Sequence, residues 1–90
     1  MDKVQENTLR TFVAEAIIKF IELTPGITSV QLGLKVLQEF SPKDIGLVLF
    51  ADTIRELILI DAIVGIFYFL PEEIIAKEIY FPKGTKINIR

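Results

Sequence analysis

Two pairs of carboxylates are the residues whose types and spacing come closest to general acid-base chemistry. Glu72 and Glu73 are adjacent, whereas Asp52 and Glu56 stand four positions apart and would share one face of a helix. Adjacent glutamates on a turn diverge, and neither pair has a sequence neighbour that would move a pKa toward neutrality. The sequence therefore predicts a protein without an enzyme active site.

Cysteine and histidine do not occur in the chain. Their absence excludes disulfides, thiolate nucleophiles and the usual zinc sites, and it removes the side chain that titrates near neutral pH. No acidic segment has the spacing of a calcium-binding loop. Residues 83–85 are similar to the end of a phosphate-binding loop, but the upstream glycine is missing. We therefore expect no cofactor and no metal ion.

The composition is that of one small, apolar domain. The chain has 90 residues, of which 51% are hydrophobic and 24% are charged. A chain of this size buries only about 60–65% of the surface that it exposes when unfolded, so apolar area is expected to remain uncovered. We expect a single domain over residues 1–90 that binds a protein partner or a second copy of itself, as a homo-oligomer.

The net charge of −2 is unevenly distributed. Residues 1–76 contain six Lys or Arg against eleven Asp or Glu, whereas residues 77–90 contain four against one. The acidic body argues against broad attraction to nucleic acid or to an anionic membrane. The N-terminus lacks a signal-peptide pattern, and the uncharged stretch over 62–71 is too short to cross a bilayer. A cytoplasmic protein without membrane association is expected.

The first predicted element is an amphipathic helix that begins at Asn7 or Thr8 and ends at Thr24-Pro25-Gly26. Its apolar face consists of Leu9, Phe12, Val13, Ala16, Ile17, Phe20 and Leu23. Three more apolar residues widen this face, namely Ala14, Ile18 and Ile21. They predict either a second core contact or a surface for self-association, and the sequence favours neither.

Two further helices follow across a tight turn. Thr28 and Gln31 have the spacing of a capping box, and Ile27 and Leu32 occupy the positions of a hydrophobic staple. The apolar face of this second helix consists of Val30, Leu34, Leu37 and Phe40. The third helix is predicted over residues 42–60, with Ser41 as its N-cap. Its expected inward stripe is Leu47, Phe50, Ala51, Ile54, Leu57 and Ile58, and Thr53 is expected on its outward face.

A change of pattern after Asp61 predicts strands. Residues 62–70 are rich in β-branched and aromatic side chains and are too apolar for a strand with a solvated face, so we expect both faces to be covered. A second strand is predicted over 76–81, a turn over 82–85 and a third strand over 86–90.

The order of three helices followed by a β-hairpin is that of the winged helix-turn-helix superfamily. The segment Asp52-Thr53-Ile54-Arg55-Glu56-Leu57-Ile58 through Ile63-Val64, followed by Phe67-Tyr68-Phe69-Leu70-Pro71, resembles the third helix of that family running into its first wing strand. The resemblance extends over residues 8–81, and Asp61 stands where many members have glycine. It implies an α+β fold of winged-helix type with a C-terminal β-hairpin or small antiparallel sheet, and DNA binding through the third helix and the wing.

The outward face of the third helix argues for a protein partner instead. Base readout and phosphate contact need several basic or amide side chains, whereas an aliphatic face rimmed by charges is typical of a protein interface. We therefore expect a non-enzymatic interaction or regulatory module that binds its partner through Ile45, Val48, Leu49, Asp52, Arg55 and Glu56. The alternative is that the aliphatic members belong to the core and that the charged members are ordinary solvated surface.

Two other functions stay open. Direct DNA binding would use the third helix and the basic group Lys77, Lys83, Lys86 and Arg90, whose four charges support salt-sensitive, nonspecific binding. A purely structural subunit of a homo-oligomer is the other alternative. A setting in transcription or replication follows only by analogy with the winged-helix resemblance.

Overall fold

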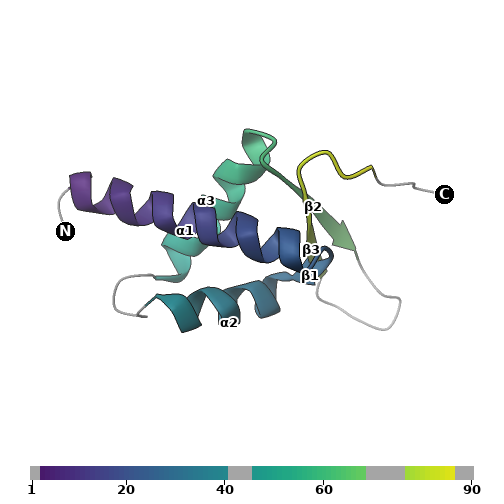
Figure 1. Cartoon of the computed structure of the whole chain (residues 1–90), viewed down its shortest axis with the longest axis horizontal. Coiled ribbons are helices and arrows are strands. Elements are labelled where there is room, and N and C mark those ends of the chain that lie inside the picture. The colour runs from purple at the N-terminus through teal and green to yellow at the C-terminus, as the bar shows by residue number, and fades with distance from the viewer. Residues whose placement is uncertain (1–2, 41–45, 69–76, 87–90) are drawn as a thin grey trace.

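The computed structural model describes residues 3–40, 46–68 and 77–86, which form three helices and one small sheet. The elements are α1 (Lys3–Leu23), β1 (Ile27–Thr28), α2 (Ser29–Glu39), α3 (Leu47–Leu59), β2 (Ile63–Tyr68) and β3 (Lys77–Pro82). Helix α1 packs against both other helices, and the sheet lies at its C-terminal end (Figure 1). The expected α+β class with a small antiparallel sheet is confirmed.

Helix α1 begins earlier than predicted and is rotated relative to the predicted face. It starts at Lys3, so that Thr8 lies inside the helix instead of capping it. Its buried residues are Val13, Ala16, Ile17 and Ile21. Phe12 and Leu23, which were expected in the core, are exposed. The helix therefore contacts the rest of the chain along the line of residues 13, 17 and 21.

This rotation changes the location of the proposed self-association residues. Ile21 is 0% exposed and belongs to the core, because it continues the buried line of α1 by one more turn. Ala14 and Ile18 are half-buried and pack against the same core. A self-association surface that includes Ile21 is therefore inconsistent with its burial.

Helix α2 begins as predicted. The amide of Gln31 donates to Thr28 Oγ1 over 3.2 Å, and the amide of Thr28 donates to Gln31 Oε1 over 3.4 Å, which completes the capping box. The two buried residues of the helix are Leu32 and Val36, one turn apart. The face that was predicted from the apolar spacing is therefore not the face that packs on α1.

Helix α3 is also turned relative to its predicted stripe. It begins at Leu47 after Gly46, and the expected N-cap at Ser41 lies outside the described residues. Thr53 is only 1% exposed, although its position around the helix placed it on the outward face. Its hydroxyl donates to the carbonyl of Leu49 over 2.7 Å, and this hydrogen bond removes the cost of burying it. Ala51, expected inward, is exposed.

The chain leaves α3 through a residue with a left-handed backbone. Asp61 has φ of 60°, a conformation that glycine adopts most easily and that aspartate tolerates better than most residues. Many members of the winged helix-turn-helix superfamily have glycine at the position that resembles Asp61. The backbone conformation of Asp61 is one that favours glycine.

Strand β3 is the central strand of the sheet, whose order is β1-β3-β2. Both neighbours are antiparallel to it, and Tyr80 stands opposite Ile27 on one side and Gly65 on the other. The two-residue strand β1 was not expected, because Ile27 was assigned only to a helix staple. The expected third strand over 86–90 lies largely outside the described residues, and Lys86 is not part of a strand.

Strand β2 is covered less completely than its sequence suggested. Ile63 is its one buried residue, and Phe67 near its other end is 68% exposed. Four of its other residues are half-buried, so β2 is not covered on both faces along its described length, contrary to the prediction from the sequence. The uncovered side chain of Phe67 contributes to the site described next.

Candidate functional site

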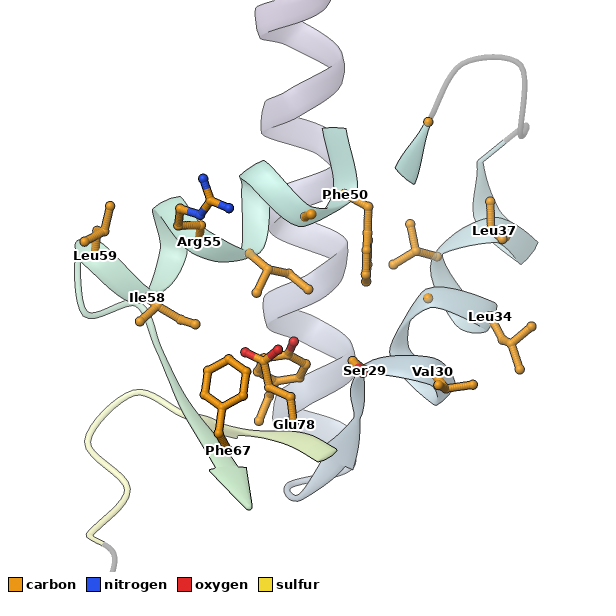
Figure 2. A pocket seen from close by; sticks show the side chains of 16 residues that line it. Ser29, Val30, Leu34, Leu37, Phe50, Arg55, Ile58, Leu59, Phe67 and Glu78 are labelled. Atoms are coloured by element: carbon orange, nitrogen blue, oxygen red, sulfur yellow. The ribbon is translucent and has the colours of Figure 1, made fainter. Parts of the chain in front are cut away.

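A groove of about 770 Å³ lies between α2, α3 and the sheet (Figure 2). We call it the α2–α3 groove, and it is lined by Ser29, Val30, Gly33, Leu34, Val36, Leu37, Gly46, Phe50, Ala51, Ile54, Arg55, Ile58, Leu59, Phe67, Glu78 and Tyr80. Helix α2 forms one wall, α3 forms the opposite wall, and β2 with β3 forms the floor. A volume of this size is typical of binding sites rather than of packing defects.

The groove concentrates the exposed apolar surface of the chain. Nine large apolar side chains are exposed in the described part of the chain, and five of them line the groove, namely Val30, Leu34, Leu37, Leu59 and Phe67. Three of the five come from α2, because Leu32 and Val36 turn its other side toward the core. Exposed apolar side chains that cluster in this way usually mark an interaction site, whereas single exposed apolar side chains do not.

Two polar side chains of the floor stand side by side on β3. Tyr80 is only 1% exposed, and its hydroxyl forms a hydrogen bond with Glu78. Figure 2 shows the Glu78 carboxylate beside the ring of Phe67, directed into the groove. Burial raises the pKa of the Tyr80 hydroxyl well above its ordinary value, and the hydrogen bond with Glu78 and the negative charge of that residue raise it further.

The raised pKa of Tyr80 predicts a loss of stability at alkaline pH. An unfolded tyrosine ionises near pH 10, so above that pH the unfolded chain has released a proton that the folded chain retains. Between pH 9 and pH 11 the wild type should therefore lose about 1 kcal/mol more free energy of unfolding than Tyr80→Phe. Urea denaturation at the two pH values measures this difference. An equal alkaline loss in Tyr80→Phe would contradict the assignment.

Gly65 lies between Ile58 of α3 and the floor of the groove. A Cβ atom at this position would lie 2.9 Å from Cδ1 of Ile58 and 3.5 Å from Oε1 of Glu78. Since Cδ1 is the end of a flexible side chain, a small residue at position 65 would require a shift of the Ile58 side chain and not of α3 itself.

The residues predicted to bind a partner are distributed over α3, and one of them reaches the groove. That residue is Arg55, which is exposed on the α3 wall. Val48 is 73% exposed but does not line the groove, and Leu49 is half-buried against the core. Ile45 lies outside the described residues. Sequence reasoning therefore located one wall of the groove and missed the α2 wall and the floor.

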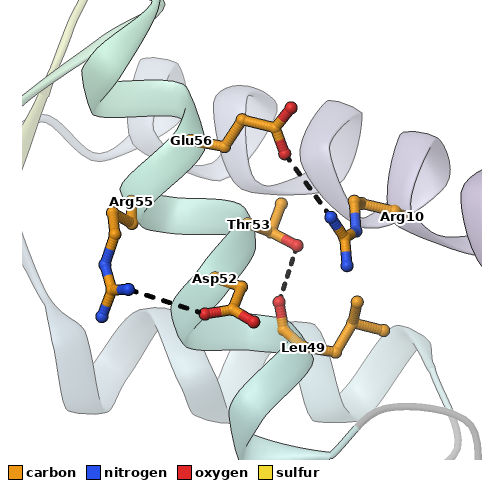
Figure 3. A network of polar contacts seen from close by, with 6 residues as sticks. All are labelled: Arg10, Leu49, Asp52, Thr53, Arg55 and Glu56. Atoms are coloured by element: carbon orange, nitrogen blue, oxygen red, sulfur yellow. Dashed lines mark hydrogen bonds and ion pairs between the residues drawn. The ribbon is translucent and has the colours of Figure 1, made fainter.

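The acidic residues of the same set are engaged within the chain (Figure 3). Asp52 pairs with Arg55 on α3 at 3.9 Å, and Glu56 pairs with Arg10 of α1 at 3.8 Å. Each pair is partly exposed to solvent, so its contribution to stability is small. The Arg10–Glu56 pair nonetheless links α1 to α3. The position of Glu56 is therefore explained by the packing of these two helices, and no binding partner is needed to explain it.

Ala14 and Ile18 line a smaller hollow of about 390 Å³ on the other side of α3. Residues of α1 and α3, including Glu15 and Glu56, form it together with Ile60, which follows α3. It lacks the cluster of exposed large apolar side chains that distinguishes the α2–α3 groove, since Ile60 is the single such residue among its lining. It is therefore the weaker candidate.

The basic group proposed for nucleic acid is divided between the two ends of β3. Lys77 begins the strand, whereas Lys83 and Lys86 follow its end, and all three are exposed. A strand of this length separates Lys77 from Lys83 by roughly 20 Å. Arg90 lies outside the described residues. The described lysines therefore do not converge on one patch.

The carboxylates whose spacing came closest to acid-base chemistry lie on α3 or outside the described residues. Asp52 and Glu56 pair with different arginines, and Glu72 and Glu73 lie outside the described residues. Within residues 3–40, 46–68 and 77–86, no three acidic side chains lie close enough together to hold a metal ion. In the same ranges no helix combines the length and the apolar character needed to span a bilayer.

Comparisons with known proteins do not assign a family. No protein-family model matches the chain, and no curated protein or solved structure shows significant similarity to it. The geometry and chemistry of the groove are therefore the basis for assigning a function to the chain.

Proposed function

We propose that the chain is a non-enzymatic interaction module of winged-helix-like type that binds a protein partner through the α2–α3 groove. The observation that carries the proposal is the concentration of exposed large apolar side chains in this groove. The element order α1-β1-α2-α3-β2-β3 supports the winged-helix resemblance. The expected cytoplasmic location and a setting in transcription or replication remain part of the proposal.

The shape and lining of the groove favour a helical ligand. Two helices form its walls, and an amphipathic helix laid between them could bury one apolar face against Leu34, Leu37 and Phe67. Arg55 and Glu78 supply one charge of each sign at the edge and floor. Interfaces commonly have this arrangement of an apolar centre with a few charges around it.

DNA is the less favoured partner because the exposed face of α3 is poor in positive charge. Arg55 lies beside Asp52 at 3.9 Å, and Glu56 adds a second carboxylate to the same helix. Phosphates would have to approach these carboxylates, and apolar side chains gain little in a hydrated groove of DNA. The separation of the lysines along β3 argues in the same direction.

A labelled amphipathic peptide tests the proposal. The probe is a helical peptide of about 20 residues with leucines at i, i+3, i+4 and i+7 spacing, and its binding is followed by fluorescence anisotropy. Leu34→Glu places a carboxylate on the α2 wall and should weaken binding roughly tenfold or more. Leu23→Glu is the matched control, since Leu23 is exposed like Leu34, at 70% against 59%, but lies on α1 outside the groove.

Two results would contradict the proposal. One is a folded wild type that does not bind the peptide, and the other is equal weakening by Leu34→Glu and Leu23→Glu. A shift assay with duplex DNA at low salt tests the alternative; binding that is lost on charge reversal of Lys83 and Lys86 would favour DNA.

A further inference from the structure

We infer that the partner helix carries a basic side chain within its apolar face, and that Glu78 on the floor of the α2–α3 groove binds this side chain beside the ring of Phe67. The inference rests on the proposed function, because it requires a helix in the groove. It adds the chemistry by which the groove distinguishes one apolar helix from another.

Glu78 and Phe67 form a cross-strand pair on the floor of the groove. They stand opposite one another on β3 and β2, and such pairs have Cβ atoms about 4.5–5.5 Å apart. Both side chains line the groove, and Figure 2 shows the carboxylate of Glu78 beside the ring of Phe67. A cation bound to this carboxylate would therefore lie within the roughly 6 Å over which the face of an aromatic ring attracts positive charge. The two side chains favour the same kind of ligand group.

The arginine that lines the same groove does not neutralise Glu78. Nη1 of Arg55 lies 3.9 Å from Oδ1 of Asp52, which is on the same helix and outside the groove lining. Figure 2 shows the guanidinium of Arg55 directed away from the floor on which Glu78 lies. Tyr80 donates a hydrogen bond to Glu78 but brings no charge. The floor of the groove is therefore negative beside Phe67.

A ligand that covers Glu78 must compensate its carboxylate for the water that it displaces. Glu78 is half-buried in the free chain, and a helix seated over Phe67 would remove more of that water. A charged group that is desolvated without a partner weakens a complex strongly. The carboxylate has acceptor positions beyond the one that Tyr80 uses. A purely apolar helix should therefore bind less tightly than one that places a basic side chain opposite Glu78.

Arginine is the basic residue that suits this pair of side chains best. Its planar guanidinium can donate two parallel hydrogen bonds to one carboxylate and can stack on an aromatic ring at the same time. Lysine offers a compact charge that is more strongly hydrated and loses more when it leaves water. The arginine form of the ligand is therefore the probe that should show the largest preference.

Three labelled helical peptides that differ at one position test the inference, with binding followed by fluorescence anisotropy. Each has leucines at i, i+3 and i+7 spacing, and the remaining position of the apolar face is arginine, glutamine or glutamate. The wild type should bind the arginine peptide roughly tenfold or more tightly than the glutamate peptide, with the glutamine peptide between them. Glu78→Gln keeps an acceptor for Tyr80 but removes the charge, so this preference should fall below about threefold.

Two further variants serve as controls. Glu22→Gln makes the same change of charge at an exposed residue of α1 outside the groove, and it should keep the preference of the wild type. Phe67→Leu keeps an apolar side chain without the aromatic ring, and it should reduce the preference for arginine over glutamine about threefold. An unchanged preference in Phe67→Leu would overturn the contribution of the ring. Far-UV circular dichroism verifies that every variant is folded.

The outcomes distinguish this inference from the proposed function. A wild type that binds all three peptides equally, or favours the glutamate peptide, in a Leu34-dependent manner overturns the basic partner and leaves the groove as a protein-binding site. A preference for arginine that persists in Glu78→Gln also overturns the inference, because the preference then has another source. A wild type that binds none of the peptides refutes both.

Discussion

Truncation of Tyr80 to alanine should lower the free energy of unfolding by about 3–5 kcal/mol, the range found when a large buried aromatic side chain is removed from a core. Tyr80 is among the fully buried side chains of the chain and the largest of them in the described residues. It stands on the central strand between Ile27 and Gly65, so the cavity left by its ring would open where the three strands meet the helices. Equilibrium denaturation in urea, followed by circular dichroism, measures the loss.

Two control variants isolate the contribution of the Tyr80 ring to stability. One separates it from the contribution of the hydroxyl, and the other separates it from the general effect of removing an aromatic side chain. Tyr80→Phe keeps the ring and should cost about 1 kcal/mol, because Glu78 is partly exposed and can be solvated in the variant. Phe67→Ala removes an aromatic ring of similar size from the neighbouring strand and should change stability little, since Phe67 is exposed. A Tyr80→Ala variant as stable as Phe67→Ala would refute the burial of Tyr80.

Replacement of Ile21 by alanine should cost about 2–5 kcal/mol, which is the effect of truncating a fully buried isoleucine. Ile21 lies in the core cluster with Ile17 and Ile27. The same denaturation experiment measures the effect. If Ile21 were part of a self-association surface, the substitution would change the mass in solution and leave the stability of the monomer nearly unchanged.

Ile18 offers a control of the same residue type on the same helix. It is half-buried, so Ile18→Ala should cost roughly half as much as Ile21→Ala or less. Equal losses from the two substitutions would mean that α1 does not have the orientation seen in this structure.

The sequence predicted the helices well and their orientation poorly. The capping box at Thr28 was found because its hydrogen bonds are local and leave a fixed spacing in the chain. The buried face could not be read in the same way, because α2 has one apolar arc through Leu32 and Val36 and another through Val30 and Leu34. Periodicity shows that such arcs exist, but the packing of α1 decides which one enters the core.

The burial of Thr53 and the presence of β1 were not predicted either. Both have physical causes that residue types alone do not reveal. Thr53 was placed outward by its position opposite the apolar stripe, but its hydroxyl donates to a carbonyl of its own helix, so the side chain can be buried. Strand β1 is two residues long, and it exists because β3 lies beside it. Neither a short strand nor its distant partner leaves a periodic pattern.

The candidate site was predicted in part. Arg55 was expected on the outward face of α3, and it lies on the α3 wall of the groove. Phe67 and Glu78 reach the floor only through the register of β2 with β3, in which they stand opposite one another. That register depends on contacts between distant segments, and so the groove could not be assembled from local patterns alone.

The central place of β3 has a consequence for the order in which the chain folds. Ile27 and Tyr80 are 53 positions apart, yet their pairing closes the sheet on one side. Residues 77–86 contain three of the four basic residues found over 77–90, and the β3 part of this segment pairs with both β1 and β2. Until β3 is in place, β1 lacks the strand that it pairs with and Ile63 has no strand beside it, so residues 27–68 must wait, during synthesis, for residues 77–82 before the sheet can form.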